Sequence, residues 1–129
     1  MRVSVLLFAL LWMLPVFAAD EESSAPAIEY VAMDPKFTLN LAGRKKYLMI
    51  DVQLQVEGEQ NIEKIKKHMP ALRHALIMLF SGRNAEDLAT MDQREALRKE
   101  TAAAIRETLD KYGNSDGFRD VFFSDFLLN

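Results

Sequence analysis

The sequence predicts an α+β domain in which a small antiparallel or mixed sheet is covered on one face by three to four helices. Residues 37–41 and 47–56 alternate in side-chain character with the two-residue period of half-buried strands. Residues 62–112 carry apolar side chains at helical spacing, and residues 118–128 return to an aromatic, strand-like composition. Strands at both ends of a domain, with helices between them, favour helices packed on one face of the sheet.

Composition limits the class of protein before any element is assigned. The chain has 129 residues, which is the size of one domain, and no cysteine. The missing cysteine excludes thiol catalysis and Cys-ligated zinc. The formal net charge of −3 argues against nucleic acid as a partner, because nucleic-acid binding requires a basic surface.

The N-terminus differs from the remainder of the chain. Residues 3–19 are apolar except for Ser4 and Pro15, and Arg2 supplies a positive charge before them. We predict a secretory signal peptide over residues 1–18, with an uncleaved membrane anchor as the alternative, because such a helix would reach roughly 25 Å. Residues 19–27 form an acidic, proline-containing tether, and residues 28–129 form the folded domain.

Three strands are expected in the first half of the domain. The first covers residues 28–33 and ends at the turn formed by Asp34 and Pro35. The second covers residues 37–41, and residues 42–45 can close a hairpin to the third strand, residues 47–56. One face of the third strand is predicted to be core because its side chains are all aliphatic: Leu48, Ile50, Val52, Leu54 and Val56.

The first helical region carries an apolar stripe over residues 62–79. Pro70 interrupts it, so we expect either a kink or two helices that meet at Met69 and Pro70. Gly82 is expected to end this region in a left-handed conformation.

A short helix capped by Asn84 should follow, and then a longer one. The capping box of the longer helix is either Thr90 with Gln93 or Asp92 with Glu95, and Gly113 is expected to end it.

The last strand, residues 121–128, is apolar on both faces, which predicts a position inside the sheet. The phenylalanines of this region, Phe118, Phe122, Phe123 and Phe126, are expected to belong to the core more than to a binding site. A free edge on this strand would instead allow pairing with a neighbouring chain.

We find no pattern of residues that predicts a catalytic, cofactor or metal site. His68 and His74 are six residues apart, a cumulative rotation of about 600° along a helix, so their side chains point in different directions and cannot bind one metal ion together. The adjacent carboxylates Glu86 and Asp87 suit a helix start. The glycines are too scattered for a phosphate-binding loop. The basic run Arg44, Lys45 and Lys46 is either a solvated turn or a contact for anionic lipid headgroups.

An ordered set of short motifs in this sequence resembles the flagellar basal-body protein FliL family. The resemblance runs from about Tyr30 to the C-terminus, and its pieces are individually weak but share one order. The residues that carry it most clearly are Tyr30, Asp34, Pro35, Phe37, Asn40, Leu41, Tyr47, Leu48, Pro70, Arg73, Leu97, Phe123 and Phe126.

The resemblance implies a non-enzymatic periplasmic domain with a stomatin-like (SPFH-type) fold and no cofactor. It also implies association with the flagellar stator (MotA/MotB type) at the inner membrane, self-association into a ring or a smaller oligomer, and support of flagellar rotation, swimming or swarming. The cleavable appearance of residues 1–18 departs from the family pattern of a cytoplasmic tail and a full transmembrane helix. This departure would fit a FliL-like paralogue whose partner is not the motor. The alternative function, which the stomatin-like fold and the basic run at residues 44–46 favour, is a periplasmic membrane-surface scaffold unrelated to motility.

Overall fold

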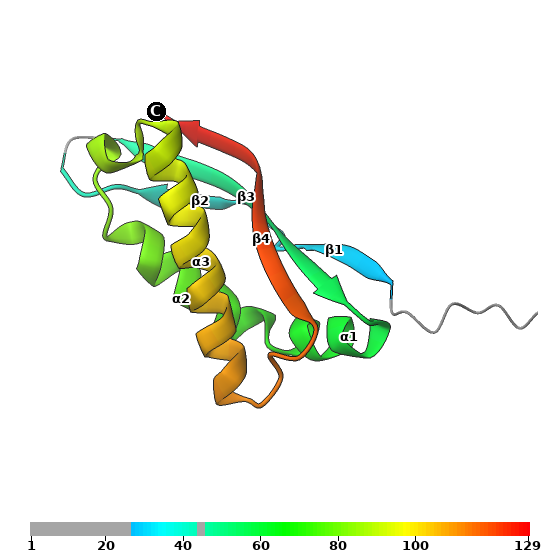
Figure 1. Ribbon diagram of the computed structural model, residues 1–129. Coiled ribbons are helices and arrows are strands. Elements are labelled where there is room, and N and C mark those ends of the chain that lie inside the picture. The colour runs from blue at the N-terminus through cyan, green and yellow to red at the C-terminus, as the bar shows by residue number, and fades with distance from the viewer. Residues whose placement is uncertain (1–26, 44–45) are drawn as a thin grey trace, which may run out of the picture.

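The computed structural model describes residues 27–43 and 46–129, and its α+β architecture confirms the predicted class (Figure 1). The predicted leader 1–18, nearly all of the tether, and Arg44 and Lys45 lie outside the described residues. Within the described ranges, no helix combines the length and apolar character that a membrane span requires. The elements in chain order are β1 (Ile28–Ala32), β2 (Phe37–Asn40), β3 (Tyr47–Glu57), α1 (Glu59–Lys67), α2 (Met69–Ser81), the 3-10 helix η1 (Ala85–Leu88), α3 (Met91–Lys111) and β4 (Phe118–Leu128).

β3 is the centre of an antiparallel sheet and pairs with every other described strand. β1 and β2 share one edge of β3, with Val31 opposite Leu54 and Leu39 opposite Leu48. β4 occupies the other edge along nearly its whole length. The mixed-sheet alternative is thereby removed for the described strands.

The prediction that the last strand lies inside the sheet is wrong, because β4 pairs with β3 alone and is an edge strand. Its apolar character has another cause. The helix α3 runs beside β4 and packs its side chains against it, so the strand is covered by a helix where a second strand was expected (Figure 1).

The core lies between one face of the sheet and the helices. All five aliphatic side chains predicted on β3 are buried, as expected from their alternation. They meet apolar stripes of α1, α2 and α3 on the same side of the sheet (Figure 1). Thr101 is the one buried polar side chain of α3, and its hydroxyl donates to the Leu97 carbonyl at 2.7 Å. The hydroxyl is satisfied within the helix, so its burial leaves no unpaired polar atom.

Two helix boundaries agree with the prediction. α1 and α2 are separate helices that meet at His68, with Pro70 in the first turn of α2, where a missing amide donor is tolerated. α3 begins with the Thr90–Gln93 capping box: Gln93 N–H donates to Thr90 Oγ1 at 3.1 Å, and Thr90 N–H donates to Gln93 Oε1 at 3.0 Å.

Two other boundaries differ. Gly82 follows α2 with φ −83°, so it does not adopt the left-handed conformation that was expected. Asn84 precedes η1 but its side chain makes no capping hydrogen bond to that helix. The chain instead turns here by pairing Ala42 with Asn84, and the Ala42 N–H donates to the Arg83 carbonyl at 3.1 Å. Tertiary pairing therefore replaces the local capping that the sequence suggested.

Candidate interaction site between α3 and β4

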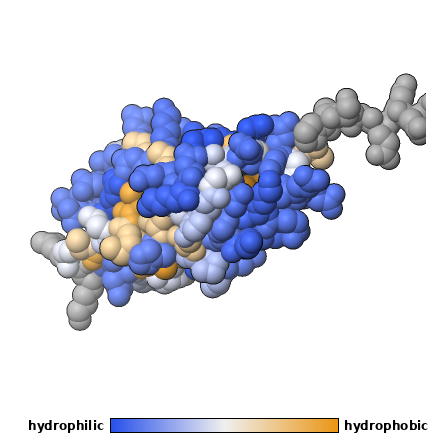
Figure 2. All heavy atoms as spheres, turned by 90° about the horizontal axis from the view of Figure 1, so that it is seen from below, coloured by the Kyte–Doolittle hydropathy of each residue, from blue (hydrophilic) through white to orange (hydrophobic). Residues whose placement is uncertain are grey.

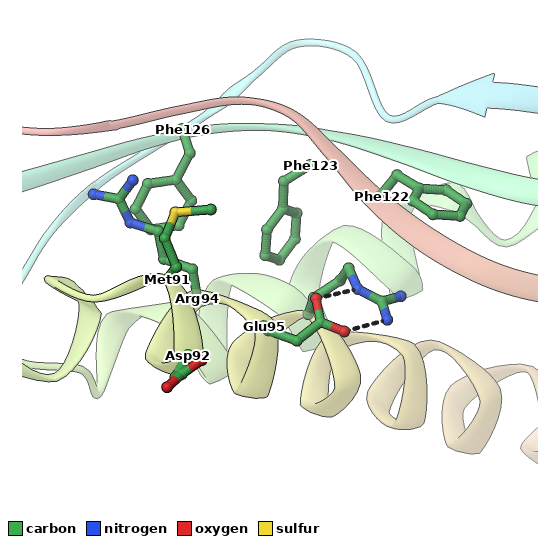
Figure 3. A pocket seen from close by; sticks show the side chains of 8 residues that line it. Met91, Asp92, Arg94, Glu95, Phe122, Phe123 and Phe126 are labelled. Atoms are coloured by element: carbon green, nitrogen blue, oxygen red, sulfur yellow. Dashed lines mark hydrogen bonds and ion pairs between the residues drawn. The ribbon is translucent and has the colours of Figure 1, made fainter.

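A groove of about 630 Å³ lies between the first half of α3 and the second half of β4 (Figure 3). Phe123 and Phe126 project from β4 toward α3, and both are half-buried. Met91, which is 77% exposed, stands at the start of α3. The residues that line the groove are Met91, Asp92, Arg94, Glu95, Arg98, Phe122, Phe123 and Phe126.

Three arginines of α3 stack on three phenylalanines of β4. The guanidinium carbon of Arg94 lies 4.4 Å from the Phe126 ring centre, and that of Arg98 lies 5.6 Å from the Phe122 centre. Arg106 lies 5.0 Å from the Phe118 centre. The arginine numbers rise as the phenylalanine numbers fall, because α3 and β4 run in opposite directions. We call these three contacts the arginine–phenylalanine ladder.

At the first half of β4 the arginines also close the outer edge of the strand. Arg98 Nη1 donates to the Val121 carbonyl at 3.0 Å, and Arg106 Nη2 donates to the Phe118 carbonyl at 3.2 Å. The Val121 N–H donates to the Asp120 carboxylate at 2.8 Å. Side chains thus satisfy backbone groups that would otherwise be open to pairing with another strand.

The charge of Arg98 is neutralised in this closed half. Arg98 Nη2 donates to Glu95 Oε1 at 2.6 Å, and Nη1 donates to Asp120 Oδ1 at 2.7 Å. The hydrogen bond that Arg98 donates to Glu95 is the largest cause that raises the pKa of the Arg98 guanidinium, and the same bond lowers the pKa of Glu95. Both groups are held in their charged forms.

At the second half of β4 the arrangement is more open. Arg94 Nε donates to the Leu88 carbonyl at 3.1 Å. Over residues 27–43 and 46–129, Arg94 forms no ion pair with a carboxylate, in contrast to Arg98. Its guanidinium lies over the Phe126 ring at the border of the groove (Figure 3).

The face of the sheet opposite the helices carries a second set of exposed apolar side chains. Tyr30 is 59% exposed and lies edge-on to Phe122, with ring centres 6.1 Å apart. Lys36 Nζ donates to Asp125 Oδ2 at 2.8 Å, which lowers the pKa of Asp125 and raises that of Lys36. Seen from below the view of Figure 1, the molecule presents a mainly hydrophilic surface with a limited apolar patch (Figure 2).

The phenylalanines of the last strand divide between core and groove. Phe118 is fully buried, as predicted, whereas Phe122 is 39% exposed and lines the groove. Phe123 and Phe126 are half-buried and line it as well. Phe123 and Phe126 also pack against the core, as expected, and line the groove with the rest of their rings. The expectation of a core position is wrong only for Phe122, which is exposed because β4 has no neighbouring strand beyond its outer edge.

Arg73, one of the residues that carry the family resemblance, holds the turn between β1 and β2. Its Nη1 donates to the Met33 carbonyl at 3.0 Å and to the Pro35 carbonyl at 2.7 Å. Its guanidinium also lies 4.2 Å from the Phe37 ring centre. Asp34 and Pro35 are exposed beside this contact. The predicted turn is thus tied to α2 by one side chain.

The other predicted residues fall into three groups. Phe37, Leu41, Leu48 and Leu97 are buried in the core. The Tyr47 hydroxyl accepts a hydrogen bond from Asn129 Nδ2 at 2.8 Å, and Asn40 is exposed opposite Tyr47 in the β2–β3 register. Lys46 is exposed beside the predicted basic turn, whose Arg44 and Lys45 lie outside the described residues.

The histidines lie apart, as their spacing predicted. His68 stacks on Tyr112 at the α1–α2 joint, with ring centres 4.2 Å apart, and its Nε2 lies 2.7 Å from Asn114 Nδ2. His74 is exposed on α2. The part of the chain that the structure describes holds no cluster of three or more histidine or acidic residues suited to a metal ion.

The sequence patterns did not identify the groove, the part that Arg98 and Met91 play in lining it, or the stack of Arg106 on Phe118. A signal was present: Arg94 and Arg98 are four residues apart, and phenylalanines recur every four residues at 118, 122 and 126. The first spacing places two arginines on one helix face. Their pairing with the phenylalanines depends on α3 and β4 lying side by side, which spacing alone does not predict.

Comparison with known proteins gives a consistent assignment. The family model described as "Flagellar basal body-associated protein FliL" matches residues 30–128. The flagellar protein FliL of Aquifex aeolicus is 30% identical over 98 residues, which cover 74% of this chain and 58% of that protein. FliL of Escherichia coli K12 is 27% identical over 114 residues, covering 86% of this chain and 73% of its own. The flagellar protein LafL of Vibrio parahaemolyticus is 23% identical over 114 residues, covering 87% and 65%. The chain belongs to the family of flagellar basal body-associated FliL proteins.

Proposed function

We propose that this protein is a non-enzymatic accessory component of the flagellar basal body. In this role it associates with the stator (MotA/MotB type) and supports rotation, swimming or swarming. The observation that carries the proposal is the family match over residues 30–128. The surface is compatible with such a role, because an apolar groove lies beside an edge strand, a geometry suited to protein contacts.

The same proposal includes a place and an assembly state. The domain acts in the periplasm at the inner membrane, after residues 1–18 direct its export or anchor it. It adopts a stomatin-like arrangement and self-associates into a ring or a smaller oligomer. The intact mass of the protein recovered from cells distinguishes a cleaved leader from a retained anchor, because cleavage after Ala18 removes a defined set of residues.

Deletion of the gene in its own flagellated host tests the motor role. The proposal expects slower swimming in viscous medium or reduced swarming, with recovery when the wild-type gene is restored. Flagella should still be counted by microscopy, so that a loss of filaments is distinguished from a loss of rotation. Unchanged swimming and swarming in both thin and viscous media would overturn the motor role.

The alternative function is a periplasmic membrane-surface scaffold unrelated to motility. The observation that favours it is the basic run at the β2–β3 hairpin, where Lys46 is exposed. Flotation with vesicles of anionic lipid tests it, with reversal of charge at Arg44, Lys45 and Lys46 as the control. Flotation that requires these three residues, in a protein whose deletion leaves motility intact, would support the scaffold over the motor component.

A further inference from the structure

We propose that the outer edge of β4 over Phe126–Leu128 pairs with an extended, apolar segment of a partner protein, and that Arg94 binds a carboxylate of that segment. The inference rests on the proposed function only in assuming that the protein acts through contacts with other proteins. It adds the place of contact, the backbone conformation of the partner and the chemistry of one partner side chain.

The backbone of β4 provides the first argument. Tyr47 N–H donates to the Asn129 carbonyl at 2.9 Å, and Asn129 N–H donates to the Tyr47 carbonyl at 3.0 Å. Backbone groups alternate between the two sides of an antiparallel strand, so Leu127 also faces β3, and the N–H and C=O of Leu128 face outward. The structure shows no backbone partner for Leu128 on that side among the described residues. An extended segment would satisfy these groups.

The contrast within β4 provides the second argument. Outward backbone groups at Phe118 and Val121 are bonded to Arg106, Arg98 and Asp120. Such side-chain bonds prevent a strand from adding at that half. In the second half the Phe126 N–H is engaged by the neighbouring Asp125 carboxylate, so the free outward N–H lies at Leu128. The edge therefore accepts a new strand only at the end of β4.

The groove provides the third argument, because it lies beside this open edge. Phe123, Phe126 and Met91 give it an apolar lining (Figure 3). Alternate side chains of an added strand point to the same face, so one set would enter the groove while the other faces solvent. β1 also has an unpaired edge, but the groove is lined by α3 and β4 alone.

Charge provides the fourth argument and identifies the carboxylate. Arg98 has two carboxylate partners, Glu95 and Asp120, whereas Arg94 has a single carbonyl partner in the described part of the chain. A guanidinium beside an apolar groove is best satisfied by a carboxylate, which accepts two of its N–H groups in parallel. A neutral partner would leave that charge without its complement.

The proposal is tested by measuring how short synthetic peptides bind to the protein purified from its own flagellated host. The probes have blocked termini and alternate valine with threonine, and one aspartate is moved through successive positions. Matched probes carry asparagine in its place. Fluorescence anisotropy measures affinity, and backbone amide NMR shifts locate the contact. We expect the best aspartate probe to bind about tenfold more tightly than its asparagine match, with shifts at Phe126 and Leu128.

Two protein variants and one peptide variant isolate the contributions. Arg94→Gln should remove the preference for aspartate, whereas Arg106→Gln, which alters the same kind of stack in the closed half, should retain it. Leu128→Pro should abolish binding, because it removes an amide that faces outward and is not used by β3. A probe N-methylated on its pairing edge should lose binding to the unaltered protein, so the edge is tested even if Leu128→Pro fails to fold.

Several results would overturn the inference. These are no binding by any aspartate probe, a preference that persists in Arg94→Gln, or shifts confined to β1 or to Tyr30 on the open face. Self-association that shifts Leu128 would identify a second copy of this chain as the occupant instead. None of these results affects the motility test of the proposed function, and loss of the motor role would leave peptide pairing at β4 intact.

Discussion

Arginine stacks on phenylalanine in both halves of β4, but the arginines of the two halves differ in their hydrogen-bond partners. In the first half, the donors of Arg98 and Arg106 are consumed by strand carbonyls and by carboxylates, and Phe118 is fully buried. In the second half, Arg94 has one carbonyl partner, and Phe126 is half-buried. The difference shows how one helix can stabilise one end of an edge strand and leave the other end available to a partner.

The greatest loss of stability is expected from truncating a ring at one end of the arginine–phenylalanine ladder, and the ring at the other end is its comparison. Phe118→Ala should lower the free energy of unfolding by about 3–5 kcal/mol, because it removes a fully buried ring from the core. Phe126→Ala should cost roughly half as much, because that ring is already partly hydrated. Urea unfolding measures both. Equal losses would show that the two halves are packed alike and would break the comparison.

The next largest loss of stability is expected at Gly117, the residue that directly precedes the closed half of β4. Gly117 has φ +82°, and an added Cβ would lie 2.5 Å from the Glu57 carbonyl oxygen and would overlap Asn61. Gly117→Ala should therefore cost about 3 kcal/mol, from the unfavourable φ together with the steric overlap.

Gly113→Ala is the matched control in the same α3–β4 connection. Gly113 has φ +67°, but nothing lies within 4 Å of its added Cβ. We expect a cost of about 1 kcal/mol from φ alone. Thermal unfolding of the two variants separates crowding from backbone conformation, and identical midpoints would contradict the close contact of Gly117 with Glu57.

A smaller loss of stability is expected when the arginines of the two halves are replaced. Arg98→Met should lower the free energy of unfolding by about 2 kcal/mol, because it leaves Asp120 and the Val121 carbonyl without their charged donor. Arg94→Met should cost less than about 1 kcal/mol, because it loses one carbonyl bond and retains apolar contact with Phe126. Urea unfolding at neutral pH measures both, and a larger loss for Arg94 would reverse the assignment of open and closed halves.

The smallest effect concerns pH. The folded-state pKa of Glu95, beside Arg98, and that of Asp125, beside Lys36, are both lower than their ordinary values of 4.5 and 3.8. Their contribution to stability is therefore complete above those ordinary values and is lost as pH falls through the lower folded-state values. Both groups are exposed, so the contribution is small and salt should weaken it.

Unfolding at acidic and neutral pH, with and without added salt, measures this dependence. Glu95→Gln removes the ion pair with Arg98 in the closed half, and Asp125→Asn removes the one with Lys36 on the sheet face opposite the helices. Each variant should weaken the dependence of the free energy of unfolding on pH in the acidic range. A curve that neither variant alters would show that these ion pairs do not contribute to acid stability.

Local patterns predicted most elements because each pattern expresses one local preference. The alternation along residues 48–56 specified the buried face of β3, and all five aliphatic side chains are buried. The Thr90–Gln93 capping box started α3, and Pro70 separated α1 from α2. Local capping failed at Gly82 and Asn84, where the pairing of Ala42 with Asn84 sets the turn.

The candidate site was much less predictable from the chain alone. The phenylalanines of the last strand were expected in the core, yet Phe122 is 39% exposed and lines a groove. Whether a phenylalanine is buried depends on what lies beyond its strand, and no local pattern encodes that neighbour. The different ion pairing of Arg94 and Arg98 was equally unpredictable, because it depends on which carboxylate of β4 lies beside each arginine. Asp120 pairs with Arg98.

Local spacing and the order of motif residues were enough to predict the α+β class, the order of the elements, the buried face of β3 and the family resemblance. Tertiary structure alone decided that β4 is an edge strand, that α3 closes one half of it, and that a groove remains at the other half. The reason is that β3 has only two edges. β1 and β2 share the first edge and β4 takes the second, so the outer side of β4 is left to whichever side chains of α3 can reach it.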